Sequence, residues 1–239
     1  MWYFCRKYTS KKRYRTQHAH HSRTHMKHPA IIFDLDGTLL DSLADLASSV
    51  NHALQAHGMP TRPIDEVRTF VGNGVRHLMS AAVPPNTEPT LFEQVFATFR
   101  NHYAEHCMDT TAPYSGIHEM LTALQQRNIR TAIVSNKIHS AVETLHQRFF
   151  ADTIDTAIGE SSTIRRKPHP DGLQEAMRRL GSTPETTLYV GDSEVDILTA
   201  QRCGIRCITV LWGFRDETFL RQQGADICIR EPHELLSSI

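Results

Sequence analysis

The sequence predicts an α/β fold in which a Rossmann-like parallel sheet forms the core and an α-helical cap is inserted after the first strand. A strand is expected at residues 30–34, where the apolar run Ile31-Ile32-Phe33 has the pattern of a buried strand and ends at Asp34. Residues 42–108 then show helical spacing of apolar side chains and no convincing strand. From Pro113 onwards strands alternate with helices, which indicates right-handed βαβ units on a parallel sheet. We therefore expect the core at residues 29–41 and 109–239, with the cap at 42–108.

The insert is expected to consist of helices separated by glycine and proline breaks. In the first helix, residues 43–57, apolar side chains recur at helical spacing, and Gly58 and Pro60 end the pattern. The other cap helices are expected at residues 63–70, through Met79 after the break at residues 72–74, and at residues 91–107. An insert that begins beside the end of the first strand could close over that end as a lid.

The remaining core elements are expected to alternate along the chain. The expected helices are residues 115–128, 139–149, 170–180, 194–203 and 216–222. The expected strands are residues 130–134, 154–158, 187–190, 206–211 and 225–229.

Composition is that of an ordinary globular protein, with 40% hydrophobic and 22% charged residues among 239. No apolar run approaches the roughly 20 residues that cross a bilayer, so we expect no membrane partner. The five cysteines are scattered and form no C-x-x-C pair. That pattern indicates a reducing compartment, and we expect a cytoplasmic protein.

The net charge of zero hides an asymmetry between the N-terminal segment and the rest of the chain. Residues 1–25 hold seven of the 26 Lys and Arg residues and none of the 26 acidic ones. The remainder is therefore acidic, with a charge of about −7 and no basic stripe. This argues against nucleic acid as a partner.

Residues 1–28 form a basic, His-rich tail without the apolar stretch of a secretory signal. Three interpretations compete: a disordered tail, or an upstream extension of the reading frame with Met26 as the working start; an organelle-targeting leader; or a segment that binds metal or polyanions. The last would use its histidines, namely His18, His20, His21, His25 and His28. We favour the disordered tail, because such a composition cannot bury a core.

Two acids follow the first strand. Asp34 and Asp36 are two residues apart, and Gly37 and Thr38 come next. Side chains two apart on an extended chain point the same way, and open α/β sheets place their ligands at the carboxyl ends of strands. A solvated Asp-Gly turn is the alternative interpretation.

Three further motifs have the chemistry to handle phosphate. Ser135 and Asn136 follow a strand and could bind phosphate oxygens, or could simply cap the next helix. Lys167 precedes a proline and could offset phosphate charge, or could lie in a solvated basic loop. Asp192 and Asp196 lie at a strand end and about one turn into the next helix. Their oxygens suit Mg²⁺, although acids also cap helices.

In this order the four motifs resemble those of the haloacid dehalogenase superfamily of phosphatases. The matching elements are Asp34-x-Asp36-Gly37-Thr38, Ser135, Lys167-Pro168 and Gly191-Asp192-x3-Asp196. The resemblance covers about residues 29–237. It implies hydrolysis of a small phosphomonoester through an aspartyl-phosphate, and an insert that resembles the cap of one large branch of the superfamily.

The resemblance also implies a role for each residue. Asp34 would be the nucleophile, and Asp36 would protonate the leaving oxygen and then activate water. Lys167 would neutralise charge in the catalytic centre. Mg²⁺ would be held by Asp34, Asp192 and the backbone carbonyl of Asp36, with Asp196 in an orienting role. The other implied substrate contacts are Ser135, Thr38 and Asn136.

Further details resemble the phosphoglycolate phosphatase subfamily. They are the segments Val71-Gly72-Asn73-Gly74-Val75, Ser135-Asn136-Lys137, Lys167-Pro168-His169-Pro170 and Trp212-Gly213-Phe214. On this resemblance the substrate is 2-phosphoglycolate, whose carboxylate would meet the helix that begins after Gly74 and the guanidinium of Arg76. Alternatively, the glycines only turn the chain and Arg76 is solvated.

Other functions remain open on the sequence. The same chemistry could act on a nucleotide, on pyrophosphate or on a sugar phosphate, or could serve a β-phosphoglucomutase-like phosphotransferase. A non-catalytic binding protein on this fold is disfavoured, because every catalytic position is present. We expect a small phosphorylated metabolite as partner, and a monomer or homodimer.

Overall fold

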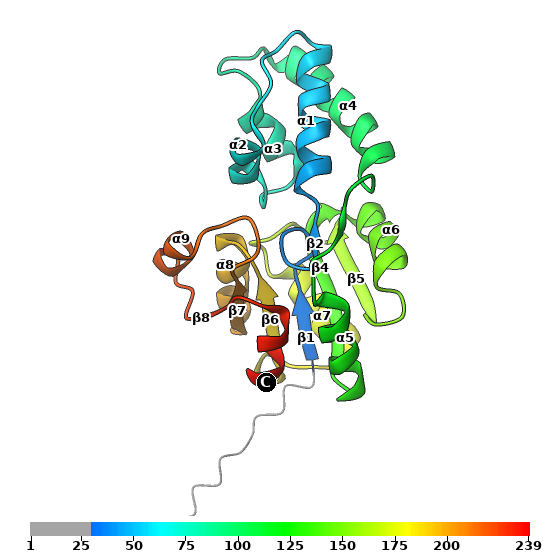
Figure 1. Ribbon diagram of the computed structural model, residues 1–239, viewed down its shortest axis with the longest axis vertical. Coiled ribbons are helices and arrows are strands. Elements are labelled where there is room, and N and C mark those ends of the chain that lie inside the picture. The colour runs from blue at the N-terminus through cyan, green and yellow to red at the C-terminus, as the bar shows by residue number, and fades with distance from the viewer. Residues whose placement is uncertain (1–29) are drawn as a thin grey trace, which may run out of the picture.

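The core of the molecule is a six-stranded parallel sheet. This computed structural model describes residues 30–239, so the predicted tail at 1–28 and its histidine cluster lie outside the described residues. The strand order is β5-β4-β1-β6-β7-β8, with helices on both faces (Figure 1). The strands are β1 (Ala30–Phe33), β4 (Arg130–Ile138), β5 (Thr156–Glu160), β6 (Thr187–Gly191), β7 (Arg206–Val210) and β8 (Ile227–Ile229). The predicted α/β fold class is confirmed.

The central strand β1 explains why the sheet needs cover on both faces. All four of its residues are buried, and alternate side chains enter two different apolar clusters. Ile31 and Phe33 lie in the cluster beneath α5 and α6, whereas Ile32 lies in the cluster beneath α7 and α8. Complete burial of a side chain of this size stabilises the folded state by about 2 kcal/mol, relative to leaving the side chain in water. The core helices are α5 (Ile117–Gln126), α6 (His139–Phe149), α7 (Asp171–Leu180), α8 (Glu194–Cys203) and α9 (Glu217–Gln222).

The inserted helices pack around an apolar cluster of their own, above the carboxyl ends of the strands (Figure 1). They are α1 (Leu43–Ala56), α2 (Ile64–Phe70), α3 (Val75–Ala82) and α4 (Pro89–His106). Val50, Leu78 and Phe99 are buried within this cluster, and Phe214 joins it from the core. We propose this cluster as the basis of a separate cap domain. Within residues 30–239 no helix is both long and apolar enough to cross a membrane.

The two links between core and cap run side by side. The two-residue strands β2 (Leu40–Asp41) and β3 (Ala112–Pro113) pair in antiparallel fashion there. Beside them the buried Asp45 accepts hydrogen bonds from the backbone N–H and the hydroxyl groups of both Thr110 and Thr111, at 2.5–3.1 Å. One carboxylate therefore joins the entering and leaving chains.

Asp45→Ala should lower the free energy of unfolding by about 3 kcal/mol, because it removes five hydrogen bonds and leaves the two donors of buried Thr111 without an acceptor. Chemical denaturation followed by circular dichroism measures this. Asp65→Ala is the matched control, because its ion pair with Arg68 is exposed and contributes little. Equal stability of the Asp45 variant and the wild type would contradict the assignment.

Candidate active site

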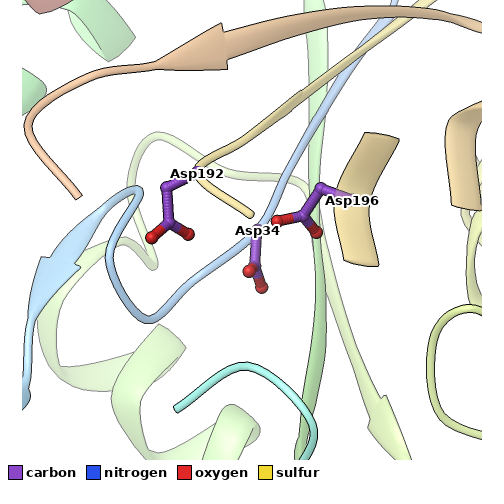
Figure 2. A group of neighbouring side chains, drawn as sticks. All are labelled: Asp34, Asp192 and Asp196. Carbon is purple, nitrogen blue, oxygen red and sulfur yellow. The ribbon is translucent and has the colours of Figure 1, made fainter. Parts of the chain in front are cut away.

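Three acids meet at the carboxyl end of the sheet, under the cap. Asp34 follows β1, Asp192 follows β6, and Asp196 lies in the first turn of α8. Each offers an oxygen atom within 4.8 Å of the others. Figure 2 shows the three side chains close together. All three residues are buried. The strand-end placement predicted from the sequence is therefore present.

Strand pairing and glycine bring these acids together. Phe33 and Val190 are partners in the β1–β6 ladder, so the residues after them emerge side by side. Gly191 has no room for a side chain, because a Cβ atom there would lie 2.4 Å from the carboxyl carbon of Asp196. Gly37 has a φ of +84°, and a Cβ atom there would lie 2.4 Å from Oδ2 of Asp192. Both positions require glycine for the acids to pack this closely.

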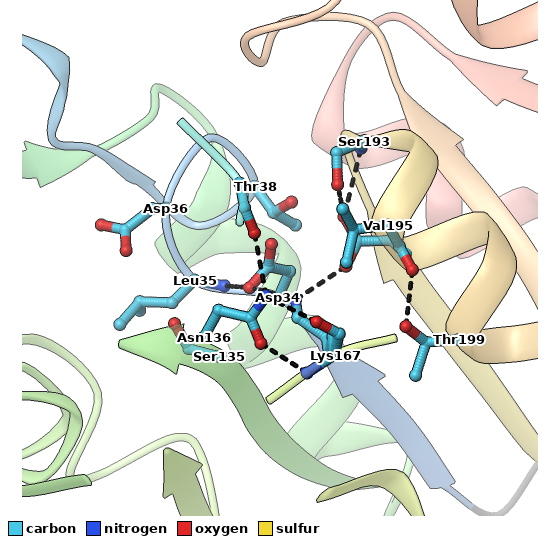
Figure 3. Close-up of polar contacts among 12 residues, drawn as sticks. Asp34, Leu35, Asp36, Thr38, Ser135, Asn136, Lys167, Ser193, Val195 and Thr199 are labelled. Carbon is cyan, nitrogen blue, oxygen red and sulfur yellow. Dashed lines mark hydrogen bonds and ion pairs between the residues drawn. The ribbon is translucent and has the colours of Figure 1, made fainter. Parts of the chain in front are cut away.

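Lys167 is the cation of this cluster. Its Nζ lies 2.8 Å from Oδ1 of Asp34, beside which Figure 3 shows it. The same Nζ lies 2.7 Å from Oδ1 of Asp196 and donates to the Tyr189 hydroxyl at 3.0 Å. Burial alone would lower the pKa of Lys167, but the charges of Asp196 and Asp34 outweigh that effect and raise it. The ammonium group therefore stays charged. Lys167 lies beside Asp34 instead of in a solvated loop, and its role in neutralising phosphate charge stays a prediction.

Three carboxyl groups share this one cation. Burial, with the charge of Asp196, raises the pKa of Asp34 well above its usual value despite Lys167. The same two causes raise the pKa of Asp192 to about 7. Among residues 30–239, Lys167 is the only cation within ion-pair distance of the three carboxylates. Hard, buried carboxylate oxygens with excess negative charge fit a divalent cation such as Mg²⁺.

Asp196 has both carboxylate oxygens occupied. Oδ1 accepts from Lys167 and from the Tyr189 hydroxyl, and Oδ2 accepts from the backbone N–H and the hydroxyl of Ser193. Burial would raise the pKa of Asp196, but Lys167 and these hydrogen bonds hold it below its usual value. Asp196 thus fixes Lys167 and also takes part in the capping box of α8, so the capping interpretation of this acid is correct, and its role in orienting a metal site stays a prediction.

Asp34, the predicted nucleophile, and Asp192 have different hydrogen-bond partners. Oδ1 of Asp34 accepts from the Leu35 backbone N–H at 2.7 Å and contacts Lys167, whereas no donor to Oδ2 is found within residues 30–239. Asp192 accepts from the Phe214 backbone N–H at 2.8 Å and from the Thr38 hydroxyl at 3.4 Å. Thr38 is fully buried and supports Asp192 instead of reaching the cleft, which differs from its predicted substrate contact.

A cleft of about 550 Å³, measured to its open mouth, lies between core and cap. Its core side is polar and its cap side is largely apolar. The core contributes Asp34, Asp36, Ser135, Asn136, Lys137, Asp192, Ser193, Phe214 and Arg215, and the cap contributes Leu46, Val71, Gly72, Gly74, Val75 and Leu78. The predicted Ser135 and Gly74 both line this cleft.

Asn136 lines the cleft, but its polar atoms form hydrogen bonds with the backbone. Its Nδ2 donates to the carbonyls of Gly72 and Lys167, and its Oδ1 accepts from the Lys167 N–H at 2.6 Å. The predicted substrate contact is therefore replaced by a positioning role, since Asn136 joins the Lys167 loop to the cap loop. Two arginines also hold the cap from the core: Arg166 donates to the Asn73 carbonyl and Arg215 to that of Val71.

Arg76 does not reach the cleft. Its guanidinium pairs with Glu93 of α4 and lies over the rings of Phe92 and Phe96, at 5.1 and 5.2 Å. Val75 already faces the cleft, and successive helical residues are rotated by about 100°, which turns Arg76 towards α4. The predicted pairing of Arg76 with a substrate carboxylate is not present in this structure.

Two buried residues that the sequence analysis did not assign complete the site. Lys137 at the end of β4 contacts both carboxylate oxygens of Asp36 and the hydroxyl of Tyr103. Lys137 is two residues beyond Ser135 on an extended chain, so the two side chains point the same way. That spacing could have indicated that Lys137 also reaches the site. Nothing in the local sequence of α4 marks Tyr103, because its partner is 34 residues away.

A comparison with protein families identifies the chain. The family model for haloacid dehalogenase-like hydrolases matches residues 31–210. The chain belongs to this family. The predicted resemblance and the expected enzyme class, a phosphatase of the haloacid dehalogenase family, are confirmed.

Relatives span nearly the whole described chain. An N-acetylmuramic acid 6-phosphate phosphatase of Pseudomonas aeruginosa is 32% identical over 215 residues, covering 88% of this chain and 94% of the relative. A phosphoglycolate phosphatase of Aquifex aeolicus is 31% identical over 207 residues, covering 86% and 94%. A crystal structure from Lactobacillus delbrueckii subsp. bulgaricus, provisionally assigned as a phosphoglycolate phosphatase, matches with a TM-score of 0.85 and 34% identity, covering 89% and 98%.

Mg²⁺ should raise the Tm of the wild type by neutralising the acid cluster, whereas Asp192→Asn should lose most of this increase. Thermal unfolding with and without MgCl₂ measures it, independently of turnover. Asp226→Asn, an exposed acid elsewhere on the core, should respond like the wild type. An equal Mg²⁺ response in the Asp192 variant would contradict the proposed metal site.

Arg76→Ala should change KM for a carboxylate-bearing phosphomonoester by less than about threefold, because it removes no contact in the cleft. Arg215→Met should raise KM by about tenfold, equivalent to roughly 1.4 kcal/mol, because it releases the cap loop. Steady-state kinetics on the two variants compares them. The reverse order of effects would show that Arg76 binds the substrate.

Proposed function

We propose that this chain is a Mg²⁺-dependent phosphatase that hydrolyses 2-phosphoglycolate to glycolate and phosphate through an aspartyl-phosphate on Asp34. The observation that carries the proposal is the buried pairing of Asp34 with Lys167, beside a second carboxylate, Asp192, in the cleft between core and cap. The named phosphoglycolate phosphatases among its relatives support the choice of substrate.

Each part of the reaction has a residue available. Asp34 would attack phosphorus and displace the alcohol, with Lys167 reducing the repulsion between carboxylate and phosphate. Ser135, buried on the cleft wall, would donate its hydroxyl to a phosphate oxygen. Asp36 would give a proton to the leaving oxygen and then take one from the attacking water. Asp34, Asp192 and the carbonyl of Asp36 would hold Mg²⁺, which supplies Lewis-acid stabilisation of the phosphoryl charge.

The cleft also suits a larger substrate. Its cap side presents Leu46, Val75 and Leu78, which could contact a carbon skeleton. The relative from Pseudomonas aeruginosa acts, by its name, on N-acetylmuramic acid 6-phosphate, which combines a phosphomonoester with a carboxylate as 2-phosphoglycolate does. A carboxylated sugar phosphate is therefore the second candidate. Cytoplasmic location and a monomeric or homodimeric state stay predictions.

Asp34→Asn should reduce kcat by at least ~10³-fold, because an amide cannot form the acyl-phosphate. Phosphate release from 2-phosphoglycolate measures it, with circular dichroism to verify folding. Near-normal turnover in the folded variant would rule out Asp34 as the nucleophile.

A panel of phosphomonoesters ranked by kcat/KM tests the substrate. It should contain 2-phosphoglycolate, N-acetylmuramic acid 6-phosphate, a hexose phosphate, pyrophosphate and a nucleoside monophosphate. We expect 2-phosphoglycolate to rank first and EDTA to abolish its turnover. A higher rank for another member would replace the substrate, and full activity in EDTA would remove the metal from the mechanism.

A further inference from the structure

Asp36, the acid–base residue of the proposed function, is not a free carboxylate. Both of its oxygens lie 2.9 Å from Nζ of Lys137, and the Ser42 hydroxyl donates to Oδ1 at 2.5 Å. It lies apart from the pair formed by Asp34 and Lys167 (Figure 3). Its position is therefore set by neighbours that the nucleophile does not share.

Lys137 has a defined partner for each of its N–H groups. The side chain is 4% exposed, and besides the two oxygens of Asp36 it donates to the Tyr103 hydroxyl at 2.7 Å. The ammonium also lies 5.0 Å from the centre of the Tyr103 ring. Since a lysine ammonium carries three donors, these contacts use its full capacity. Removing any one contact frees a buried N–H group.

The three residues come from three parts of the molecule. Tyr103 lies on α4 of the cap, Lys137 lies at the end of β4 of the core, and Asp36 lies in the loop after β1. Because Tyr103 and Lys137 are both buried, α4 must be seated on the core for the chain of contacts to form. The location of the Asp36 carboxyl group thus depends on the seating of the cap.

We propose that Lys137 and Tyr103 are positioning residues that place the carboxyl group of Asp36 for proton transfer when α4 is seated on the core. This rests on the proposed function. Proton transfer needs the oxygen within about 2.6–3.2 Å of its partner, and a displacement of about 1 Å can cost about 10²-fold in rate. Among residues 30–239, the Asp36 side chain without Lys137 would keep only the hydrogen bond from Ser42, and it would lose this placement.

The reaction divides into two halves that both use Asp36. In the first, Asp34 forms a bond to phosphorus, the bond from phosphorus to the leaving oxygen breaks, and that oxygen takes the proton of Asp36. In the second, water attacks phosphorus and gives its proton to Asp36, and the Asp34–phosphate bond breaks. When the leaving group is the anion of an acidic phenol, such as nitrophenolate, it needs no proton to leave. With such a substrate the first half of the reaction proceeds without Asp36, whereas the second half still needs Asp36 to take a proton from water.

The test compares two leaving groups in Lys137→Met and Tyr103→Phe. We expect kcat on 2-phosphoglycolate to fall by about 10²-fold in the lysine variant and by about tenfold in the tyrosine variant. With p-nitrophenyl phosphate, each variant should release one nitrophenolate per enzyme at a nearly unchanged rate and then turn over slowly. Phosphate should accumulate on the enzyme during that slow phase. Stopped-flow absorbance and quenched mass spectrometry record both.

Thr98→Val is the matched control, because it also removes a hydroxyl of α4, one that contacts His57 within the cap. It should keep wild-type rates on both substrates. An equal loss on both substrates without a burst, or unchanged kcat on 2-phosphoglycolate, would overturn the inference. Tyr103→Phe carries the same test if Lys137→Met does not fold.

The outcomes separate this inference from the proposed substrate. If the wild type rejects 2-phosphoglycolate, that substrate fails, and the comparison is made between p-nitrophenyl phosphate and the best alkyl phosphate of the panel. A burst in the variants would then still support the positioning role. If the wild type hydrolyses no phosphomonoester, the proposed function fails and this inference fails with it.

Discussion

The ammonium group of Lys167, buried between Asp34 and Asp196, is the contact on which the rest of the site depends. Three buried carboxylates within 4.8 Å of one another repel each other strongly, and the cation offsets part of that repulsion. A buried ion pair of this kind is weak evidence for stability, because the charges also lose their hydration. In the proposed function, this ion pair keeps the Asp34 carboxylate beside a fixed positive charge, at the place where the phosphate and Mg²⁺ would bind.

The cap is tied to this cluster through the same loops. Asn136 holds the backbone of Lys167 and the carbonyl of Gly72, so one side chain joins the catalytic loop to the cap loop. Lys137, its neighbour in β4, joins Asp36 to Tyr103 of the cap. Two consecutive residues of β4 therefore connect the surroundings of Lys167 and Asp36 to the inserted helices.

The sequence predicts the fold well because the core obeys local rules. Strands with buried apolar runs alternate with helices, and that pattern leaves few topologies to consider. The predicted strand at 130–134 is too short, since β4 continues to Ile138 with a shift of register after Val134. The pair β2–β3 could not be predicted, because two-residue strands carry no periodicity and their contact is long-range.

The sequence predicts those residues of the candidate site that lie at or near the ends of strands. Asp34, Lys167 and Asp192 come together because parallel strands share one edge. Arg76 was misplaced, because its helical phase is set by how α3 packs against α4, which no motif encodes. Asn136 was predicted to contact the substrate. Its amide instead donates hydrogen bonds to the Gly72 carbonyl of the cap loop and to the Lys167 carbonyl. Tyr103 depends on the docking of two domains and has no local signal.

The central claim is that Asp34 carries the phosphoryl group. Rapid acid quenching of the Mg²⁺-loaded enzyme during turnover of 2-phosphoglycolate, followed by peptide mass spectrometry, locates that group directly. The account predicts the added mass of one phosphoryl group on the peptide that contains Asp34, removed by hydroxylamine. A phosphoryl group on a different residue, or turnover at full rate with an unmodified Asp34 peptide at every quench time, would contradict it.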